Sequence, residues 1–524
     1  MNPKDVIAYL EKTRELLNWV ETKDIVDTIF EESNLRQELI IRSRKIIKFL
    51  AQEGELKPSH IARILQAIQD NQHDRNRDIK NALYDTLIES TQYISKKSLT
   101  DLIWKNLRVM ERKTFSPNTI LLINTLLRST KDDNVLTELC QTVWELVFED
   151  PNIPRDTHEK AIEKLVDISK SKNFNFQADC IRQIENNQSS TSFIRLLMEL
   201  MESQGDSKSY YASQLVKIGL PTKILENYSL YIQSARKAFE EKKKNGLIGT
   251  NEDASDVPLV GIYTHLDNVK NRLKFIEKML SLSKNNFENE SLENVWEIIL
   301  GSNITLKEKD FCLDWMVEVS KNSEQLSFVF KNFFCNPKNS KLFDSESSFN
   351  TFLRTFCTIN NNKANIRSSI STNPNNFDFK VLDIDMVGYQ DLWTVILGIK
   401  DEFLFKKGLT FLLDLHLKLD KLYENSANQV RFVFCRTATK RLRQFSTKIQ
   451  NNEEDALFQC NRLLGILKEF IEITEVKKES TSSHSNPQSE NEENKLPAPR
   501  FFFFFFFHFF FFFNFYLIFI FFLF

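Results

Sequence analysis

Cysteine is the first residue type that could carry chemistry in this 524-residue chain, as a nucleophile, a metal ligand or half of a disulfide. The cysteines are odd in number, widely spaced and include no C-x-x-C pair, so neither a disulfide framework nor a zinc site is indicated. Arg436 beside Cys435 could lower the pKa of that thiol, but the apolar residues around it are typical of a packed helix. We therefore expect structural thiols in a reduced, intracellular chain, at Cys140, Cys180, Cys312, Cys335, Cys357, Cys435 and Cys460.

The histidines are isolated, and no H-E-x-x-H or Cys/His cluster with zinc spacing occurs, so we predict no metal site. They are His60, His73, His158, His265, His416, His484 and His508. His265 follows Thr264 at the expected start of a helix, which favours a role in hydrogen bonding or capping over a partner contact. No phosphate-binding glycine loop is present among the 11 glycines, and no cofactor is expected.

Two groups of cations could bind an anionic partner. One lies in a predicted helix and comprises Arg431, Arg436, Lys440, Arg441, Arg443 and Lys448. No aromatic residues alternate with these cations as a stacking platform would require, and the formal net charge is −2, so a solvated helix face is favoured over RNA binding. The other group, Lys242–Lys244, is most simply the edge of a loop.

Tryptophan residues line the peptide groove of importin-type armadillo proteins, each paired with Asn four residues later. None of the tryptophans here has that Asn, which favours core packing over cargo binding. They are Trp19, Trp104, Trp144, Trp296, Trp315 and Trp393.

Helices must position these residues, because apolar residues recur at helical spacing from Pro3 to about Glu475. Ser59 precedes a stripe of four apolar residues at i, i+3, i+4 and i+7, namely Ile61, Ile64, Leu65 and Ile68. Turn formers are scarce, with 11 Gly and 12 Pro, which excludes an all-β protein. The chain is therefore predicted to be all-α.

The helices repeat in pairs at an offset of roughly forty residues, the period of HEAT and armadillo arrays. First helices are expected to begin near Ser59, Ser98 and Asn134, and second helices near Asp78, Pro117 and His158. One pair cannot bury its own apolar stripe, whereas stacked pairs share a continuous core. We predict an armadillo/HEAT-like α-solenoid of stacked helix pairs.

Composition divides the chain into five segments. Repeats are expected over residues 1–241 and 262–475, separated by a loop at 242–261 that is rich in Gly, Pro and Asp. A second polar stretch, 360–376, reads as a surface loop. Residues 476–500 have almost nothing to bury and are predicted to form a disordered linker.

The last segment, 501–524, is almost all phenylalanine, holding 17 of the 46 Phe residues. Its length and apolarity suit a transmembrane segment. A near-homopolymer of Phe is also what a T-rich non-coding tract would encode, so a gene-model artefact is the other hypothesis.

Four sequence blocks carry a resemblance to a known family. They are Tyr263-Thr264-His265-Leu266 through Val269 to Arg272–Ile276, Arg36–Leu50, Val295-Trp296 through Phe311–Trp315, and Gly388–Trp393. In this order and spacing the chain resembles, from about residue 30 to 475, the armadillo-like region of the large fat facets-type ubiquitin-specific proteases, in the ubiquitin carboxyl-terminal hydrolase family. The resemblance covers only the region that precedes the catalytic domain in that family.

The resemblance implies a non-catalytic scaffold that positions client proteins in the ubiquitin pathway. No cysteine lies in a Gly-Asn-Thr-Cys-type box, so we expect no enzyme activity in this chain. Protein partners, no nucleic acid and a cytoplasmic location are expected, with a membrane location only through a genuine 501–524 anchor. The alternatives are a C-terminally tail-anchored membrane adaptor and, less favoured, an importin-like transport adaptor. The sequence identifies no binding residues.

Overall fold

The computed structural model describes residues 3–482 apart from short gaps. The gaps are 32–35, 71–76, 95–96, 110–114, 130–132, 149–152, 173–175, 187–190, 248–253, 302, 321, 337–338, 340–341, 369–378, 422–426, 452 and 454. The predicted tail at 501–524, most of the predicted linker, His73, His484 and His508 lie outside the described residues. The chain divides into two compact units, residues 1–430 and 431–524.

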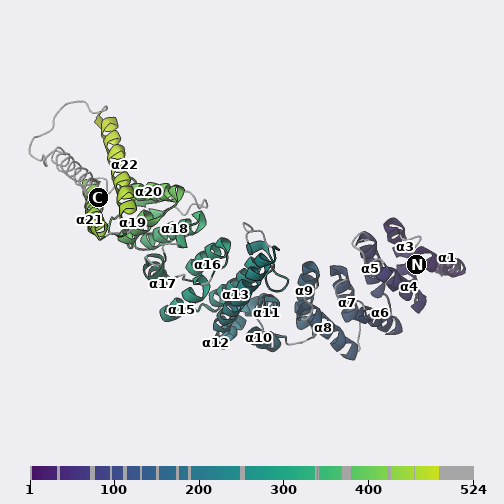
Figure 1. The fold of residues 1–524 in the computed structure, drawn as a ribbon. Helices are drawn as coiled ribbons and strands as arrows, with labels where there is room; N and C mark the ends of the chain where they lie inside the picture. The colour runs from purple at the N-terminus through teal and green to yellow at the C-terminus, as the bar shows by residue number, and fades with distance from the viewer. Residues whose placement is uncertain are drawn as a thin grey trace, which may run out of the picture. The chain divides into compact units, whose positions relative to one another are not determined.

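Unit 1 is built from helices that follow one another in chain order (Figure 1). Its first half contains α1 (Pro3–Thr22), α2 (Ile25–Ile29), α3 (Gln37–Gln52), α4 (Pro58–Asp70), α5 (Arg77–Thr91), α6 (Lys97–Val109), α7 (Pro117–Ser129), α8 (Asp133–Phe148), α9 (Arg155–Lys172), α10 (Gln177–Asn186) and α11 (Thr191–Glu202). The observed starts of α4 to α9 lie within three residues of the predicted ones, which confirms the helical period of about forty residues.

The second half of unit 1 continues the pairs and adds two short strands. It contains η4 (Gly205–Ser207), α12 (Lys208–Lys217), α13 (Leu220–Lys244), η5 (Ala254–Asp256), α14 (His265–Ser283), α15 (Asn289–Leu300), α16 (Leu306–Val319), α17 (Ser323–Val329), the π-helical turn η6 (Phe330–Phe334), α18 (Glu346–Asn362), β1 (Ile366–Ser368), β2 (Phe379–Val381), α19 (Tyr389–Gly398) and α20 (Glu402–Leu417).

The helices of unit 1 stack in two layers. The first layer runs through successive contacts from α3 to α5, α7, α9, α11, α14, α16 and α18. The second layer includes α4 against α6, and α10 against α13, α15 and α17 in turn. Helix α4 turns its apolar stripe toward the shared core, where Ile61, Ile64, Leu65 and Ile68 are all at most 1% exposed. The predicted α-solenoid is confirmed in this stacking.

Two predicted loops contain regular structure. Lys242–Lys244 form the last turn of α13, where cations are favoured by the negative end of the helix dipole, and are thus not a loop edge. The polar stretch 360–376 begins in the last turn of α18 and includes β1, which pairs antiparallel with β2. Val381 of β2 also forms a parallel bridge to Leu419. The strands were not predicted, because they are only three residues long.

A glycine in the left-handed region sets the start of α19. Gly388 has φ +76°, and a Cβ there would lie 2.3 Å from Cε1 of Phe330. Phe330 belongs to a buried cluster of aromatic rings and stacks on Phe352, with ring centroids 5.4 Å apart. Only a residue without a side chain lets the backbone approach this ring so closely.

Unit 2 contains most of α21 (Ala427–Gln450) and α22 (Ala456–Ser482). Phe434 of α21 stacks on Phe470 of α22, with ring centroids 3.9 Å apart. A connection of five residues joins the two helices, as in an antiparallel helix pair. α22 extends to Ser482 and so includes the first seven residues of the predicted linker, 476–482. No helix in the described part of the chain is both long and apolar enough to cross a membrane.

Candidate functional site

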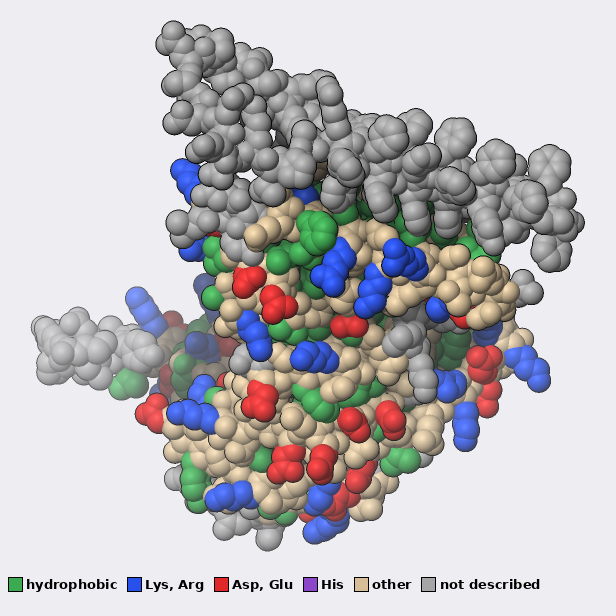
Figure 2. Space-filling view, turned by 90° about the vertical axis from the view of Figure 1, so that its left-hand side faces the viewer, with side chains coloured by type: hydrophobic (Ala, Val, Ile, Leu, Met, Phe, Trp, Pro, Cys, Tyr) green, Lys and Arg blue, Asp and Glu red, His purple; other side chains and the backbone are tan. Residues whose placement is uncertain are grey.

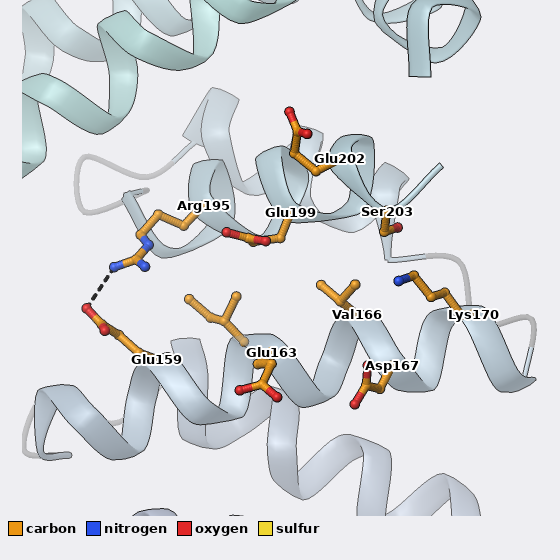
Figure 3. Close-up of a pocket in the computed structure, with 10 residues that line it drawn as sticks. Glu159, Glu163, Val166, Asp167, Lys170, Arg195, Glu199, Glu202 and Ser203 are labelled. Carbon is orange, nitrogen blue, oxygen red and sulfur yellow. Dashed lines mark hydrogen bonds and ion pairs between the residues drawn. The ribbon is translucent and has the colours of Figure 1, made fainter. Parts of the chain in front are cut away.

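A groove lies between α9 and α11, two neighbouring helices of the first layer (Figure 3). Its volume is about 350 Å³. Five carboxylates and two cations line it together with two apolar side chains and a serine. The lining residues are Glu159, Ile162, Glu163, Val166, Asp167 and Lys170 from α9, and Arg195, Glu199, Glu202 and Ser203 from α11 and the residue after it.

One end of the groove is fixed by bonds between the two helices. Nη1 of Arg195 on α11 donates to Oε1 of Glu159 on α9 at 2.9 Å. His158, adjacent to Glu159, hydrogen bonds through Nε2 to Ser192 Oγ at 2.9 Å and through Nδ1 to the hydroxyl of Tyr263 at 2.9 Å. The guanidinium of Arg195 lies over the ring of Tyr263, 5.2 Å from its centroid. These contacts set the spacing of α9 and α11 at this end.

Basic neighbours hold most of the groove carboxylates in the ionised form. Hydrogen bonds from Lys160 and Lys164 keep the pKa of Glu163 below its ordinary value, despite partial burial. An ion pair with Lys278 of α14 does the same for the pKa of Glu202. Asp167 accepts from Nζ of Lys164 at 2.8 Å.

Glu159 is held ionised in the same way. Burial acts to raise its pKa, but the hydrogen bonds and charges of Arg195 and Arg155 together outweigh burial. The pKa of Glu159 therefore lies below its ordinary value. Glu159, Glu163 and Glu202 therefore stay ionised at neutral pH and are poor proton donors.

A second polar cluster is fully buried and joins α11, α13, α14 and α16. Arg272 has no exposed surface, and burial lowers its pKa to about 10. Its Nε donates to Oδ1 of Asn227 at 3.0 Å, and its Nη1 donates to Oγ1 of Thr191 at 2.6 Å. The guanidinium also lies over the ring of Tyr231, 4.5 Å from its centroid.

The same cluster continues through His265, the first residue of α14. Its Nδ1 hydrogen bonds to the hydroxyl of Tyr231 at 2.9 Å and its Nε2 to Oε2 of Glu308 at 3.1 Å. Burial acts to raise the pKa of Glu308, but bonds from His265 and from the backbone N–H of Ile304 hold it below its ordinary value. The predicted hydrogen-bonding role of His265 is confirmed.

The buried cluster is a structural feature that the sequence did not reveal. Its members look like surface residues in sequence, since they are Asn, Thr, Arg and Glu. They lie far apart along the chain, with Arg272 separated from Thr191 by 81 positions. The only signal is that Arg272 and His265 fall in the most family-like sequence block.

The thiols lie in the core, as expected. All are buried except Cys435, which is partly exposed. Burial raises the pKa of Cys435, so Arg436 does not make it a thiolate. Burial also raises the pKa of Cys357 to about 12. Neutral thiols in the core are poor nucleophiles.

The remaining histidines are dispersed. His60 is half-buried, and burial lowers its pKa despite nearby carboxylates. His416 is fully buried on α20, where burial lowers its pKa to about 4. Among the described residues no group of His, Cys, Asp and Glu could hold a metal ion.

Core packing explains most of the tryptophans. Trp104, Trp296, Trp315 and Trp393 are buried. Trp144 is partly buried and stacks on Phe176. Trp19 on α1 differs, because half of its surface is exposed.

The basic stretch predicted near residue 440 lies on α21, in unit 2. Arg436, Lys440, Arg443 and Lys448 are exposed, whereas Arg431 and Arg441 are partly buried. The groove and the basic stretch thus belong to different compact units.

Comparison with known families identifies the array. The profile described as "UBP24/USP9X/USP9Y ARM repeat" matches residues 4–360, which span α1 to most of α18. The chain belongs to this family. The match to the armadillo repeats of these ubiquitin-specific proteases confirms the predicted resemblance. It includes the groove and the buried cluster, and it ends before Gly388–Trp393 and before α21.

Other comparisons add little. No curated protein matches the chain. Among solved structures, a "Circular tandem repeat protein with novel repeat topology and enhanced subunit contact surfaces" is 12% identical and aligns over 90% of this chain and 99% of its own. Its TM-score is 0.18, so the alignment supports no argument about shape or function.

Proposed function

We propose that this chain is a non-catalytic scaffold that holds client proteins of the ubiquitin pathway for a deubiquitinase. The observation that carries the proposal is the match of residues 4–360 to the armadillo repeats of ubiquitin-specific proteases. The stacked layers support it, because helix arrays present extended surfaces on which many weak side-chain contacts add up. The neutral, buried thiols support a binding role over a catalytic one.

The first layer is the surface that we assign to client contact. Its exposed side carries ion pairs between successive helices, such as Arg44 on α3 with Glu89 on α5 and Arg354 on α18 with Asp314 on α16. Charged side chains of this kind exchange partners at low cost, since exposed ion pairs contribute only about 0–1 kcal/mol each. The membrane-adaptor and importin-like alternatives remain predictions from the sequence.

A gain-of-targeting experiment tests the proposal. The catalytic domain of a ubiquitin-specific protease would be fused to the full chain and expressed in cells. The expected result is a fall in ubiquitination of a restricted set of proteins that also co-purify with the fusion. Hydrolysis of a small fluorogenic ubiquitin substrate should be unchanged, because the array does not touch the catalytic centre.

Two controls make the result decisive. The same catalytic domain alone, and fused to an unrelated HEAT array of similar length, should leave that set of proteins ubiquitinated. If the unrelated array targets the same proteins, or if the chain targets none, the proposed function is wrong.

A further inference from the structure

Helix α21 has a charge composition unlike that of the chain as a whole. It carries six cations and no carboxylate in 24 residues, whereas the whole chain has a formal net charge of −2. Like charges three or four residues apart repel one another by a few tenths of a kcal/mol per pair. Arg436 and Lys440 stand four residues apart, and Lys440 and Arg443 three. The helix therefore retains a repulsion that an anionic partner would relieve.

The exposed cations lie on one face of α21. At about 100° per residue, Phe432, Arg436, Lys440 and Arg443 fall within an arc of about 80° and extend over about 16 Å. All four are exposed, and Phe432 leaves 53% of its surface uncovered. The opposite side of the helix is buried through Val430, Phe434, Ala438, Leu442 and Phe445. We call the exposed set, Phe432, Arg436, Lys440 and Arg443, the basic stripe.

The cations of the stripe are not neutralised within the part of the chain that the structure describes. None of the three forms an ion pair with a described carboxylate, in contrast to Lys448, which pairs with Glu453 at 3.0 Å. On the side where Figure 1 draws α21, a space-filling view shows Lys and Arg side chains interspersed with Asp and Glu (Figure 2).

We infer that the basic stripe binds an acidic segment of a partner protein that carries an apolar side chain beside its carboxylates. Three cations on one helix face match a short row of carboxylates, and Phe432 at one end supplies an apolar contact. A protein segment fits better than a nucleic acid. The stripe is one helix wide and holds a single aromatic ring, so it lacks the row of stacking platforms on which the bases of a nucleic acid are bound.

This inference concerns unit 2 and stands apart from the proposed function. The stripe lies beyond residues 4–360, the part of the chain that matches the armadillo family. The experiment on targeting of ubiquitinated proteins and the experiment on binding of an acidic segment can therefore give a negative result independently of each other.

The test uses the full chain, kept in a non-ionic detergent because of the apolar 501–524 sequence. Its probe is a fluorescein-labelled peptide rich in Glu with a Leu near one end, and binding is followed by fluorescence anisotropy. A counterpart with Gln in place of Glu, and a labelled single-stranded poly-uridine of similar length, are measured in parallel. We expect the Glu peptide to bind, the Gln peptide not to bind, and the affinity to fall as salt is raised.

The variant Arg436→Gln/Lys440→Gln/Arg443→Gln should weaken binding of the Glu peptide by about tenfold or more, as loss of three exposed charge contacts implies. Its helices should remain folded, because all three side chains are exposed. The matched control Lys237→Gln/Lys243→Gln/Lys244→Gln removes the same charge from α13 and should bind like the parent. Phe432→Ala should weaken binding by several-fold with an unchanged salt dependence.

Three results would overturn the inference. The Glu peptide would not bind, or the α13 control would lose as much affinity as the stripe variant, or poly-uridine would bind more tightly than the peptide and depend on the same three cations. The last result would assign the stripe to nucleic acid.

Discussion

Arg272 is a guanidinium held in the core by neutral oxygens and a tyrosine ring. Its hydrogen bonds to Asn227 and Thr191 connect α14 with α13 and α11, and no exposed surface remains for hydration. A buried charge of this kind is tolerated only when its donors are satisfied. Removing the side chain leaves the amide and hydroxyl partners without it in a dry environment.

We expect Arg272→Ala to lower the free energy of unfolding by about 2–4 kcal/mol, since buried polar groups lose their partners. Arg272→Lys should lower it less, although an ammonium cannot reproduce the planar fork that spans two helices. Urea unfolding followed by tryptophan fluorescence measures these changes in the free energy of unfolding. Trp315 reports on this region, because its indole N–H donates to the carbonyl of Leu273, the residue after Arg272, at 2.7 Å.

The control for this prediction is Arg354→Ala on α18, whose side chain is half exposed and pairs with Asp314. Its effect should stay within about 0.5 kcal/mol. Equal losses at Arg272 and Arg354 would mean that the buried cluster contributes nothing specific to stability.

His416 makes stability depend on pH. Its Nδ1 lies 2.8 Å from the carbonyl of Leu412 and its Nε2 2.8 Å from the hydroxyl of Tyr389, which fixes a neutral ring that donates through Nδ1. Burial lowers its pKa from 6.5 to about 4. Between pH 6.5 and about pH 4, His416 is therefore protonated in the unfolded chain but neutral in the folded chain. The free energy of unfolding falls as the pH is lowered through this window.

When the pH is lowered from about 7 to about 5, this one group should lower the free energy of unfolding by about 2 kcal/mol. The variant His416→Gln should be less stable at neutral pH, but its further loss on acidification should be smaller by about that amount. Melting temperatures at both pH values for parent and variant measure the difference. Parallel pH curves would show that His416 does not titrate in this way.

At the scale of elements, the start of α19 depends on a close approach of backbone to ring. Gly388 packs against Phe330 of the π-helical turn η6, and its φ of +76° is a conformation that other residues rarely adopt. The two facts point the same way, because both a β-carbon and an ordinary backbone angle would force α19 away from η6.

Gly388→Ala should therefore destabilise unit 1 by about 2–3 kcal/mol, through steric overlap and backbone strain. Gly398→Ala at the other end of α19 is the matched control, because nothing lies within 4 Å of a Cβ there. That control should be neutral or stabilise by up to about 1 kcal/mol. Thermal unfolding of both variants measures the contrast, and equal effects would exclude a role for the Phe330 contact.

The sequence predicts an element well where the spacing of apolar residues within that one segment is enough to define it. The stripe from Ile61 to Ile68 defines α4 without reference to any other segment, because helical spacing is local. It fails for β1 and β2, whose three residues each gain their place only from pairing across 369–378 and from the bridge to Leu419. It also fails for the groove, since its walls come from two helices whose spacing is set by His158, Ser192 and Tyr263.

At the scale of the whole molecule, the layered contacts of unit 1 limit how far a disturbance spreads. Helices of a stacked array touch mainly their neighbours, so stability is close to a sum of repeat and interface contributions. The fold class was predictable for the same reason, because the period of about forty residues is visible in sequence. The surface that we propose for client contact was not predictable, since the residues that face solvent follow no period that a packing argument can use.

This locality has a measurable form. Arg272→Ala should raise amide hydrogen exchange in α11, α13, α14 and α16, which share the buried cluster, and leave α3 to α7 unchanged. Hydrogen exchange followed by mass spectrometry of the full chain separates these segments. A uniform rise across unit 1 would show that the array unfolds as one cooperative body.

The spacing of the cysteines has a further consequence. Six buried thiols are spaced along the chain from α8 to α22, and a seventh, Cys435, is partly exposed. A thiol sealed in the core reacts with an alkylating reagent only when the structure around it opens. The rate at which each cysteine is alkylated therefore reports the opening frequency of its own stretch of helices, and the unmodified chain carries its own set of local probes along the array.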